Sequence, residues 1–418
     1  MSKRLHAMTS LKDSEALRDI AAEVRDAVLS QLDVHLDRLA SNWERNGGRV
    51  FFAADASEAT DYVLDIAKRV EAKLVVKSKS MASEEIRLNE ALIEQGIEPV
   101  ETDLGEFIIQ LAGEHPSHII TPAIHRSKED VAALFGPLAG RVLPAETGPL
   151  AAFARAHLSE QFLRADIGIN GVNFGIADEG ALCLVTNEGN GRMCNALPRV
   201  HIAIMGMERV AADWDQLAVM LSLLARSATG QKLTQYTSIT FGPRPSGEYD
   251  GPDESHLIIL DNGRSRALGT DQQSILRCIR CGACLNVCPV YRQVGGHAYD
   301  PVYSGPIGAV LNPTLRENAT ELAHASSLLR RVHGSVSGPD PSPRPPDRIA
   351  EQAREPVFAC GASRLQVMGS GVDPRHPVPA DPPGRSSSCP SVGTTADEAT
   401  ASSLPEPMDQ ESSLHGTL

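Results

Sequence analysis

The pattern in this sequence that is most specific for a chemical role is a run of four cysteines, Cys278, Cys281, Cys284 and Cys288, which Pro289 follows directly. Thiolates are soft ligands that suit iron–sulfur centres. The spacing C-x2-C-x2-C-x3-C with a terminal Cys-Pro is that of the bacterial ferredoxin-type loop, which binds a [4Fe–4S] cluster. We therefore predict that these four cysteines bind such a cluster, with a zinc site and inert thiols as the alternatives.

Other features of the run refine this prediction. In two-cluster ferredoxins the fourth cysteine of such a run binds the other cluster, so Cys288 predicts a second run further along the chain. Gly282 is expected to let the backbone pass close to the cluster sulfides, and Pro289 to turn the chain away from them. Elsewhere, Cys183 and Cys194 are predicted to be buried small residues.

A glycine-rich loop is a second candidate site, for an anion or a small substrate. Its residues are Asn187, Glu188, Gly189, Asn190, Gly191 and Arg192. The glycines free backbone N–H groups, and the arginine can pair bidentately with a carboxylate. The alternative is an ordinary turn with an exposed arginine. The segment 77–80, Lys-Ser-Lys-Ser, could likewise bind an anion at a helix N-terminus or be a solvated basic turn.

The sequence assigns no catalytic residue. His118 and His125 lie near expected strand ends, and we predict structural roles for both because the sequence supplies no partner for either. There is no Ser-His-Asp elbow, Walker loop or G-x-G-x-x-G fingerprint. The chain is therefore not expected to be catalytic alone.

Composition narrows the class of protein. The 418 residues are 42% hydrophobic and 22% charged, which is typical of a globular protein of two or three domains. A net charge of −14 argues against nucleic acid as the main partner. No apolar run is long enough for a membrane span, the first residues do not form a signal peptide, and half of the eight cysteines lie in one ligand motif. These features predict a cytoplasmic protein in a reducing compartment.

The elements that must position these residues alternate between strand and helix over much of the chain. Helices are expected at 11–43, 57–70, 83–95 and 214–226, and strands at 49–53, 73–77, 98–101, 118–122, 181–186, 201–206 and 256–261. The segment 165–177 resembles packed strands joined by a tight turn. Such alternation predicts an α/β fold with a doubly wound parallel sheet.

Four parts of the chain follow from these patterns. We expect an N-terminal helical segment at 1–45, the α/β domain at 46–264 and a small helical, ferredoxin-like 4Fe-4S domain, truncated, at 265–327. The tail at 328–418 is rich in Pro, Ser, Gly and Arg, has no sustained apolar period and is predicted to be disordered. Cys360 and Cys389 would have no role there, although Cys389 could donate a replacement ligand.

Taken together, several motifs resemble the lactate utilisation protein B family. They are residues 168–173, 185–193 and 226–232, the cysteine run with Tyr291 and Arg292, and residues 305–309. The resemblance extends roughly from Leu36 to Pro313. It implies a LUD domain, similar in fold to the isomerase and CoA-transferase-like group, followed by a ferredoxin-type domain. It also implies membership of a three-component cytoplasmic system that oxidises L-lactate to pyruvate, in which this component relays electrons.

The chain departs from this family after residue 328. A second C-x2-C-x3-CP run is expected there, whereas residues 329–341 contain no cysteine. One permitted coding of these residues, read after its first nucleotide is dropped, gives Cys-Gly-Ala-Cys-Thr-Glu-Val-Cys-Pro-Val-Arg-Ile, which is the missing motif. We therefore interpret the tail as out of frame, with loss of the second cluster. An authentic disordered tail is the alternative.

Three functions fit the sequence. The first is an electron-transfer subunit of lactate oxidation that works with other subunits of the system. The second is a stand-alone redox enzyme that binds a small carboxylate at 187–192. The third is a structural module whose cluster has no redox role. Because Cys288 has lost its intended site, the remaining cluster could be incomplete, recruit Cys288 or be unstable.

Overall fold

The computed structural model describes residues 2–299 and 302–315. The predicted out-of-frame tail at 328–418, with Cys360 and Cys389, lies outside these residues. The described helices are α1 (Ser2–Thr9), α2 (Ser14–Ser30), α3 (Leu32–Arg45), α4 (Ala56–Arg69), α5 (Met81–Glu85), α6 (Leu88–Glu94), α7 (Leu104–Ala112), α8 (Lys128–Ala139), α9 (Thr147–Arg164), α10 (Asn190–Ala196), α11 (Trp214–Ala228), α12 (Ala283–Val287), α13 (Pro289–Val294) and α14 (Gly305–Leu315), with short 3-10 helices η1 (Arg264–Ala267), η2 (Gln273–Arg277) and η3 (His297–Tyr299). The described strands are β1 (Arg49–Ala53), β2 (Leu74–Lys77), β3 (Glu98–Glu101), β4 (Ile167–Gly171), β5 (Phe174–Ile176), β6 (Ala181–Thr186), β7 (Val200–Gly206), β8 (Val210–Ala211), β9 (Tyr236–Thr240) and β10 (Glu254–Leu260).

The centre of the fold is a six-stranded sheet in the order β1-β10-β7-β4-β2-β3, in which every neighbouring pair is parallel. Its middle strands are buried over almost their whole length, including polar residues such as His201 and His256, because helices cover both faces of the sheet. β10, the last strand in sequence, lies between β1 and β7: His256 pairs with Arg49 on one side and with Ile202 on the other. This arrangement confirms the predicted parallel α/β class.

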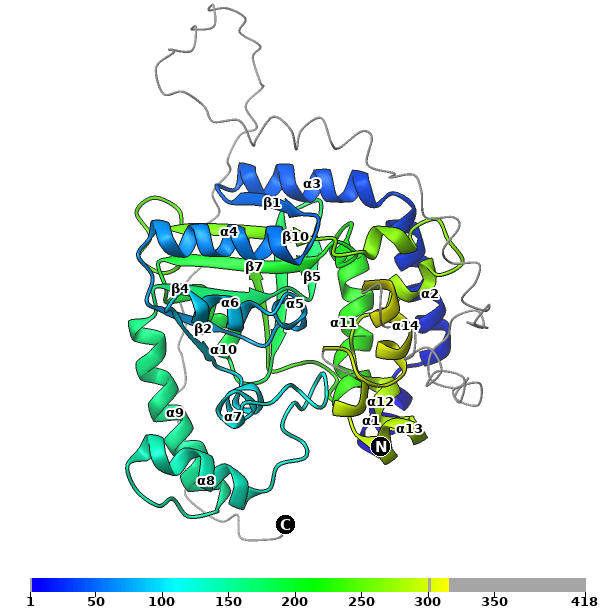
Figure 1. Cartoon of the computed structure of the whole chain (residues 1–418). Coiled ribbons are helices and arrows are strands. Elements are labelled where there is room, and N and C mark those ends of the chain that lie inside the picture. The colour runs from blue at the N-terminus through cyan, green and yellow to red at the C-terminus, as the bar shows by residue number, and fades with distance from the viewer. Residues whose placement is uncertain (1, 300–301, 316–418) are drawn as a thin grey trace, which may run out of the picture. The chain divides into compact units, whose positions relative to one another are not determined.

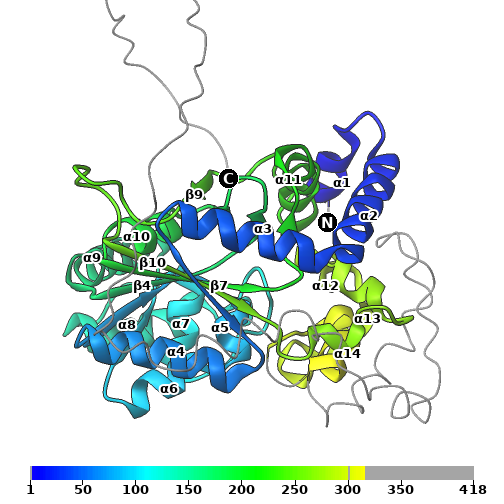
Figure 2. The same ribbon diagram turned by 90° about the horizontal axis from the view of Figure 1, so that it is seen from above.

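Helices cover the two faces of this sheet (Figures 1 and 2). Val63 and Ile66 of α4 pack with Ile258 on one face. On the other face, Leu39 and Trp43 of α3 join a separate apolar cluster. α7, α8 and α9 contribute a third cluster over the β2 and β3 side of the sheet. Figure 2 shows α3 on one side of β7 and β10 and α4 on the other, which is the doubly wound arrangement that the sequence predicted.

A smaller, four-stranded sheet in the order β8-β5-β6-β9 accompanies the first. β6 pairs antiparallel with both β5 and β9, and β5 pairs parallel with β8. The predicted pair of packed strands at 165–177 therefore divides: β4 enters the large sheet and β5 the small one. This division places the end of β6, and the loop that follows it, beside the large sheet.

Three predicted elements were wrong in detail. Residues 118–122 form no strand, because Nδ1 of His118 accepts hydrogen bonds from the backbone N–H groups of Ile120 and Thr121 and closes a turn. The helix predicted at 11–43 is broken at Gln31 into α2 and α3. The helix predicted at 83–95 is two short helices, separated where Arg87 adopts a left-handed backbone with φ of 54°.

After β10 the chain forms only short helices, from η1 to α14, as predicted for a helical cluster domain. In Figure 1 this yellow-green segment lies beside α11 and α2. Ile279 and Cys281 pack on the apolar cluster that α2 and α11 share. None of the helices in the described part of the chain has both the length and the apolar character needed to cross a membrane.

Candidate iron–sulfur centre and the polar end of the sheet

The cysteine run begins where η2 ends and coils tightly into α12. Arg280 and Gly282 both have left-handed backbones, with φ of 58° and 69°. Gly282 also faces the side chain of Ile120, so an added Cβ would lie 2.9 Å from its Cγ1. The backbone N–H of Arg280 donates to Sγ of Cys278 at 3.4 Å. This glycine therefore serves a close approach to the loop at 117–121 as well as the turn itself.

The thiols of Cys278, Cys281 and Cys284 lie close enough together to interact electrostatically. Burial raises the pKa of Cys281, and the neighbouring Cys278 raises it further. Burial likewise raises the pKa of Cys284, with added contributions from Cys278 and Cys281. Three sulfurs that would repel one another as thiolates therefore share one half-buried region. A metal centre removes this repulsion, because it takes the place of the thiol protons.

Four arginines lie close enough to this region to interact electrostatically with its cysteines, and we call them the arginine belt: Arg4, Arg25, Arg209 and Arg280. Arg209 donates to the backbone carbonyls of Cys278 at 3.1 Å and of Ile279 at 3.3 Å. Burial lowers the pKa of Arg25 and Arg209 to about 10, which leaves both protonated at neutral pH.

The belt also contains buried donors without partners. Nε of Arg4, Nε of Arg25 and Nη1 of Arg280 have no hydrogen-bond partner among the described residues. Buried donors of this kind are costly unless something satisfies them. Soft thiolate ligands surrounded by cationic N–H donors are suited to a group that carries negative charge. The donor set therefore fits an iron–sulfur cluster.

A buried ion network fixes the cysteine run to the end of the large sheet. Glu208, which follows β7, accepts from Arg280 at 3.0 Å and lies 2.8 Å from Nε of Arg264. Arg264 also forms a bidentate pair with Glu85, both contacts being 2.8 Å, and Tyr303 donates to the same carboxylate. Burial alone would raise the pKa of Glu208, but Arg264, Arg280 and Arg209 lower it to about 2.

Cys288 has different surroundings from the other three cysteines. Its side chain is 1% exposed, and its Sγ caps α13 by accepting from the backbone N–H of Tyr291 at 3.4 Å. Burial, followed by the neighbouring Cys288, raises the pKa of Tyr299 to about 12. The fourth cysteine therefore faces Tyr291 and Tyr299. Its assignment as a ligand, to this cluster or another, stays a prediction.

Residues 187–192, which were predicted to be one loop, form a short connection after β6 and then the beginning of α10. Asn187 bonds to Gln231 and to the backbone of Gln235, and Glu188 accepts from the backbone of Leu104. The remaining residues belong to the helix or its cap: Gly189 is the N-cap, and Asn190, Gly191 and Arg192 begin α10.

Most polar groups of this loop already have partners inside the protein. Asn190 donates to Thr102 at 3.5 Å, and the carbonyl of Gly191 accepts from Asn170 at 3.1 Å. Asn170 in turn contacts His201 at 3.2 Å, beside a cavity of about 20 Å³. Arg192 is exposed. Whether this loop binds an anion stays a prediction.

The two lysines of segment 77–80 do not form a solvated turn, because both side chains lie beside carboxylates inside the protein. Lys77 is fully buried and donates to Asn89 at 2.6 Å and to Glu101 at 2.7 Å. Nζ of Lys79 lies 3.9 Å from Oε1 of Glu106. The sequence could not show that these carboxylates lie beside the lysines, because Glu101 and Glu106 come from β3 and α7. Together the two lysines and the two glutamates form a buried group of polar side chains at the carboxyl end of β2 and β3.

Two family models match the chain. The LUD domain matches residues 36–260, and the 4Fe-4S dicluster domain matches residues 274–363, which extends past the described residues. The first match covers the large sheet and most of its helices. The second covers the cysteine run and supports an iron–sulfur cofactor.

Several curated proteins are similar over most of the chain. Lactate utilization protein B of Bacillus licheniformis is 52% identical over 330 residues, which are 78% of this chain and 69% of that protein. The protein of the same name from Bacillus subtilis is 50% identical over the same shares. An Escherichia coli relative named uncharacterized electron transport protein YkgF is 48% identical over 75% of this chain and 66% of its own.

One solved structure is similar in part: a DUF162 family protein from Deinococcus radiodurans, with a TM-score of 0.30 and 11% sequence identity, which matches over 55% of this chain and 98% of its own. The sequence relatives carry the assignment, because they combine high identity with high coverage of both chains. With its LUD domain, its 4Fe-4S match and relatives of this similarity, the chain belongs to the lactate utilization protein B family.

Proposed function

We propose that this chain is the iron–sulfur electron-transfer component of a multi-protein system that oxidises L-lactate to pyruvate. The observation that carries the proposal is the position of Cys278, Cys281 and Cys284 inside the arginine belt. The names of the relatives supply the metabolic context: two are lactate utilization proteins B and one is an electron transport protein. Its partners would be the other subunits of that system.

In this proposal Cys278, Cys281 and Cys284 bind one cluster. Cys288 would have bound the second cluster of the family, which we expect to be lost in this chain. A [4Fe–4S] cluster, when bound, supplies a site that accepts and releases single electrons. The belt would stabilise the negative charge of that site, because hydrogen bonds and nearby cations are among the factors that set cluster potentials. The Glu208–Arg280 ion pair would hold the loop in a fixed position relative to the sheet.

The chemistry on lactate itself is assigned to a partner. Oxidation of a hydroxy acid removes two electrons and two protons, and a one-electron centre needs another group to accept a hydride or its equivalent. His118 lies against Gly282 of the cysteine run, but its Nδ1 already accepts from two backbone N–H groups and burial lowers its pKa to about 4, so it is a poor candidate for a base. This division of roles is why the chain is not expected to oxidise lactate alone.

The test is an anaerobic reconstitution of the full chain, followed by iron and sulfide counts, EPR spectroscopy and a lactate-dependent reduction assay. We expect the EPR signal of a reduced cluster to form with lactate only when the partner subunits are present. The Cys281→Ser variant should lose the signal, and Cys194→Ala, which changes a buried cysteine of α10, should keep it. Reduction of a dye by lactate and this protein alone would overturn the proposal.

A second candidate, a stand-alone redox enzyme for a small carboxylate, draws support from the buried group at the end of β2 and β3. In open α/β sheets ligands bind at the carboxyl ends of strands, and Lys79 has an unsatisfied Nζ there. This candidate predicts lactate-dependent dye reduction that Lys79→Met and Arg192→Ala both abolish. A cluster that stays redox-silent under strong reductant would instead favour a structural module.

A further inference from the structure

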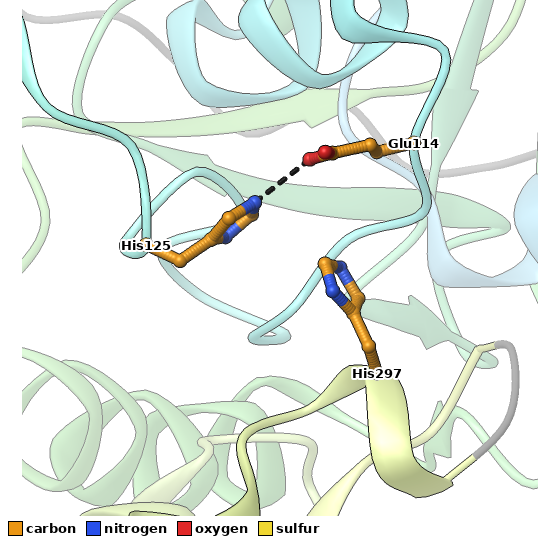
Figure 3. A group of neighbouring side chains, drawn as sticks. All are labelled: Glu114, His125 and His297. Carbon is orange, nitrogen blue, oxygen red and sulfur yellow. Dashed lines mark hydrogen bonds and ion pairs between the residues drawn. The ribbon is translucent and has the colours of Figure 1, made fainter. Parts of the chain in front are cut away.

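Three side chains of the kinds that bind transition metals meet outside the cysteine run (Figure 3). Glu114 and His125 come from the loop after α7, and His297 comes from η3, after the cysteine run. One possible ligand atom from each lies within 4.8 Å of the other two. Nε2 of His125 is 2.8 Å from Oε2 of Glu114, and the rings of His125 and His297 are 4.9 Å apart between centroids.

The partners of these side chains leave the facing atoms available. Nε2 of His297 lies 2.8 Å from the backbone carbonyl of His115. A carbonyl can only accept, so Nε2 carries the proton, and in the neutral ring Nδ1 keeps its lone pair. Arg126 pairs with both oxygens of Glu114: its Nη2 donates to Oε1, and its Nε donates to Oε2 at 3.3 Å. Oε2, which faces His125, keeps a second lone pair for a metal. Metal-binding histidines and carboxylates are oriented by outer partners of these types.

An ion pair without a metal explains only part of the group. It accounts for the contacts of Glu114 with His125 and Arg126, and these two residues lower the pKa of the carboxyl even though burial opposes them. It does not involve His297, although this residue comes from a distant part of the chain and places its ring beside that of His125. The two-histidine, one-carboxylate donor set is found in catalytic zinc sites and in non-haem iron sites.

We propose that Glu114, His125 and His297 bind a divalent transition-metal ion of the Zn²⁺ class. Zinc–ligand bonds of about 2.0–2.2 Å place tetrahedral ligand atoms about 3.3 Å apart. The His125–Glu114 contact of 2.8 Å must therefore open by about half an ångström. Such a shift is available to side chains near the surface: His125 is 30% exposed and Glu114 29%. Three protein ligands leave one position for water.

The ion would tie the segment after the cysteine run to the LUD domain. η3 already contacts this loop through His297 and the carbonyl of His115, and Tyr291 of α13 donates to the carbonyl of Ser117 at 2.9 Å. The Cβ position of Gly296 also faces this carbonyl directly. A metal bound by one residue of η3 and two of the loop would reinforce the same contact. The site is separate from the cysteines, so its occupancy can be measured independently of the cluster.

The experiment uses the full chain with its iron–sulfur cluster reconstituted anaerobically, so that the cysteines are already occupied. The protein is treated with EDTA, equilibrated with Co²⁺, freed of unbound ion and analysed for cobalt and iron. We expect one cobalt per chain with an unchanged iron content. The cobalt spectrum should show ligand-field bands of nitrogen and oxygen donors, without the intense charge-transfer band of thiolate ligation.

Three variants and one control complete the test. His125→Gln, His297→Gln and Glu114→Gln should each weaken cobalt binding by about 100-fold or more, because even outer partners contribute about 10–100-fold. His115→Gln changes an exposed side chain of the same loop and should bind cobalt as the wild type does. Retained iron in each variant verifies folding. Absence of cobalt from the wild type, a thiolate spectrum, or equal binding by His297→Gln would overturn the proposal.

Discussion

Nζ of Lys79 lies 3.9 Å from Oε1 of Glu106, and neither atom has a hydrogen-bond partner among the described residues. Burial lowers the pKa of the lysine and raises that of the glutamic acid well above its ordinary value. Both shifts favour the neutral forms. Each group also offsets part of the shift that burial causes in the other, because Glu106 raises the pKa of Lys79 and Lys79 lowers that of Glu106. Removal of one partner would leave the other buried without compensation.

Glu106→Gln should therefore destabilise the protein by about 1–3 kcal/mol, the usual cost of an unsatisfied buried polar group. The double variant Lys79→Met with Glu106→Leu should be less destabilised than the sum of the two single variants, because apolar replacement of a buried pair is often neutral. Urea unfolding of wild type, Lys79→Met, Glu106→Leu and the double variant measures this as a double-mutant cycle. Additive effects would show that the two side chains act independently.

Acid should weaken the fold through His201. Burial, with a smaller contribution from His256, lowers the pKa of this fully buried histidine from 6.5 to about 3. Between these two pH values the unfolded chain binds a proton that the folded chain does not, so stability is complete above pH 6.5 and falls as the pH drops towards 3. The slope for one such group is about 1.4 kcal/mol per pH unit.

The measurement is the free energy of unfolding from pH 8 to pH 4 for wild type and His201→Gln. The variant is expected to be less stable at pH 8, because it loses the contacts to Asn170 and Ser255, but to show a flatter profile below pH 6.5. His6→Gln, at an exposed position, is the control and should keep the wild-type slope. An unchanged slope in His201→Gln would assign the acid sensitivity to other groups.

Gly296 should be intolerant of a side chain. An added Cβ would lie 1.7 Å from the carbonyl oxygen of Ser117, so Gly296→Ala must push η3 away from the loop. We expect a loss of about 1–3 kcal/mol, as for other overpacked positions. Gly148→Ala is the control, because nothing lies within 4 Å of its Cβ position. Thermal unfolding with limited proteolysis near residue 296 distinguishes local detachment from a general loss of stability.

The four cysteines of the run should not be equivalent. Cys281→Ser and Cys284→Ser are expected to lose most of the bound iron, because each removes one of the three sulfurs that share one region. Cys288→Ser should retain more iron, since Cys288 faces Tyr299 instead. Iron and sulfide counts on anaerobically reconstituted protein give the comparison. If Cys288→Ser lost as much iron as Cys284→Ser, all four cysteines would serve one cluster.

The sequence by itself determined the features that depend on neighbouring residues. The spacing from Cys278 to Cys288 identified an iron–sulfur loop, and apolar runs with flanking turn residues located most strands of the parallel sheet. These signals are local, because cluster loops and secondary structure are encoded over a few turns of chain. Residues 118–122 show the limit: their strand-like composition was overridden by a turn that the His118 side chain closes.

Only the tertiary structure decided which distant residues meet. The arginine belt joins Arg4 and Arg25 of the N-terminal helices to Arg209 and Arg280, and none of these positions is marked as a cluster neighbour by its local sequence. The insertion of β10 beside β1, the burial of Lys79 against α7 and the meeting of His297 with Glu114 are of the same kind. Such contacts depend on how helices and strands pack, and burial then sets the charge state of each group. Local periodicity carries no record of that packing.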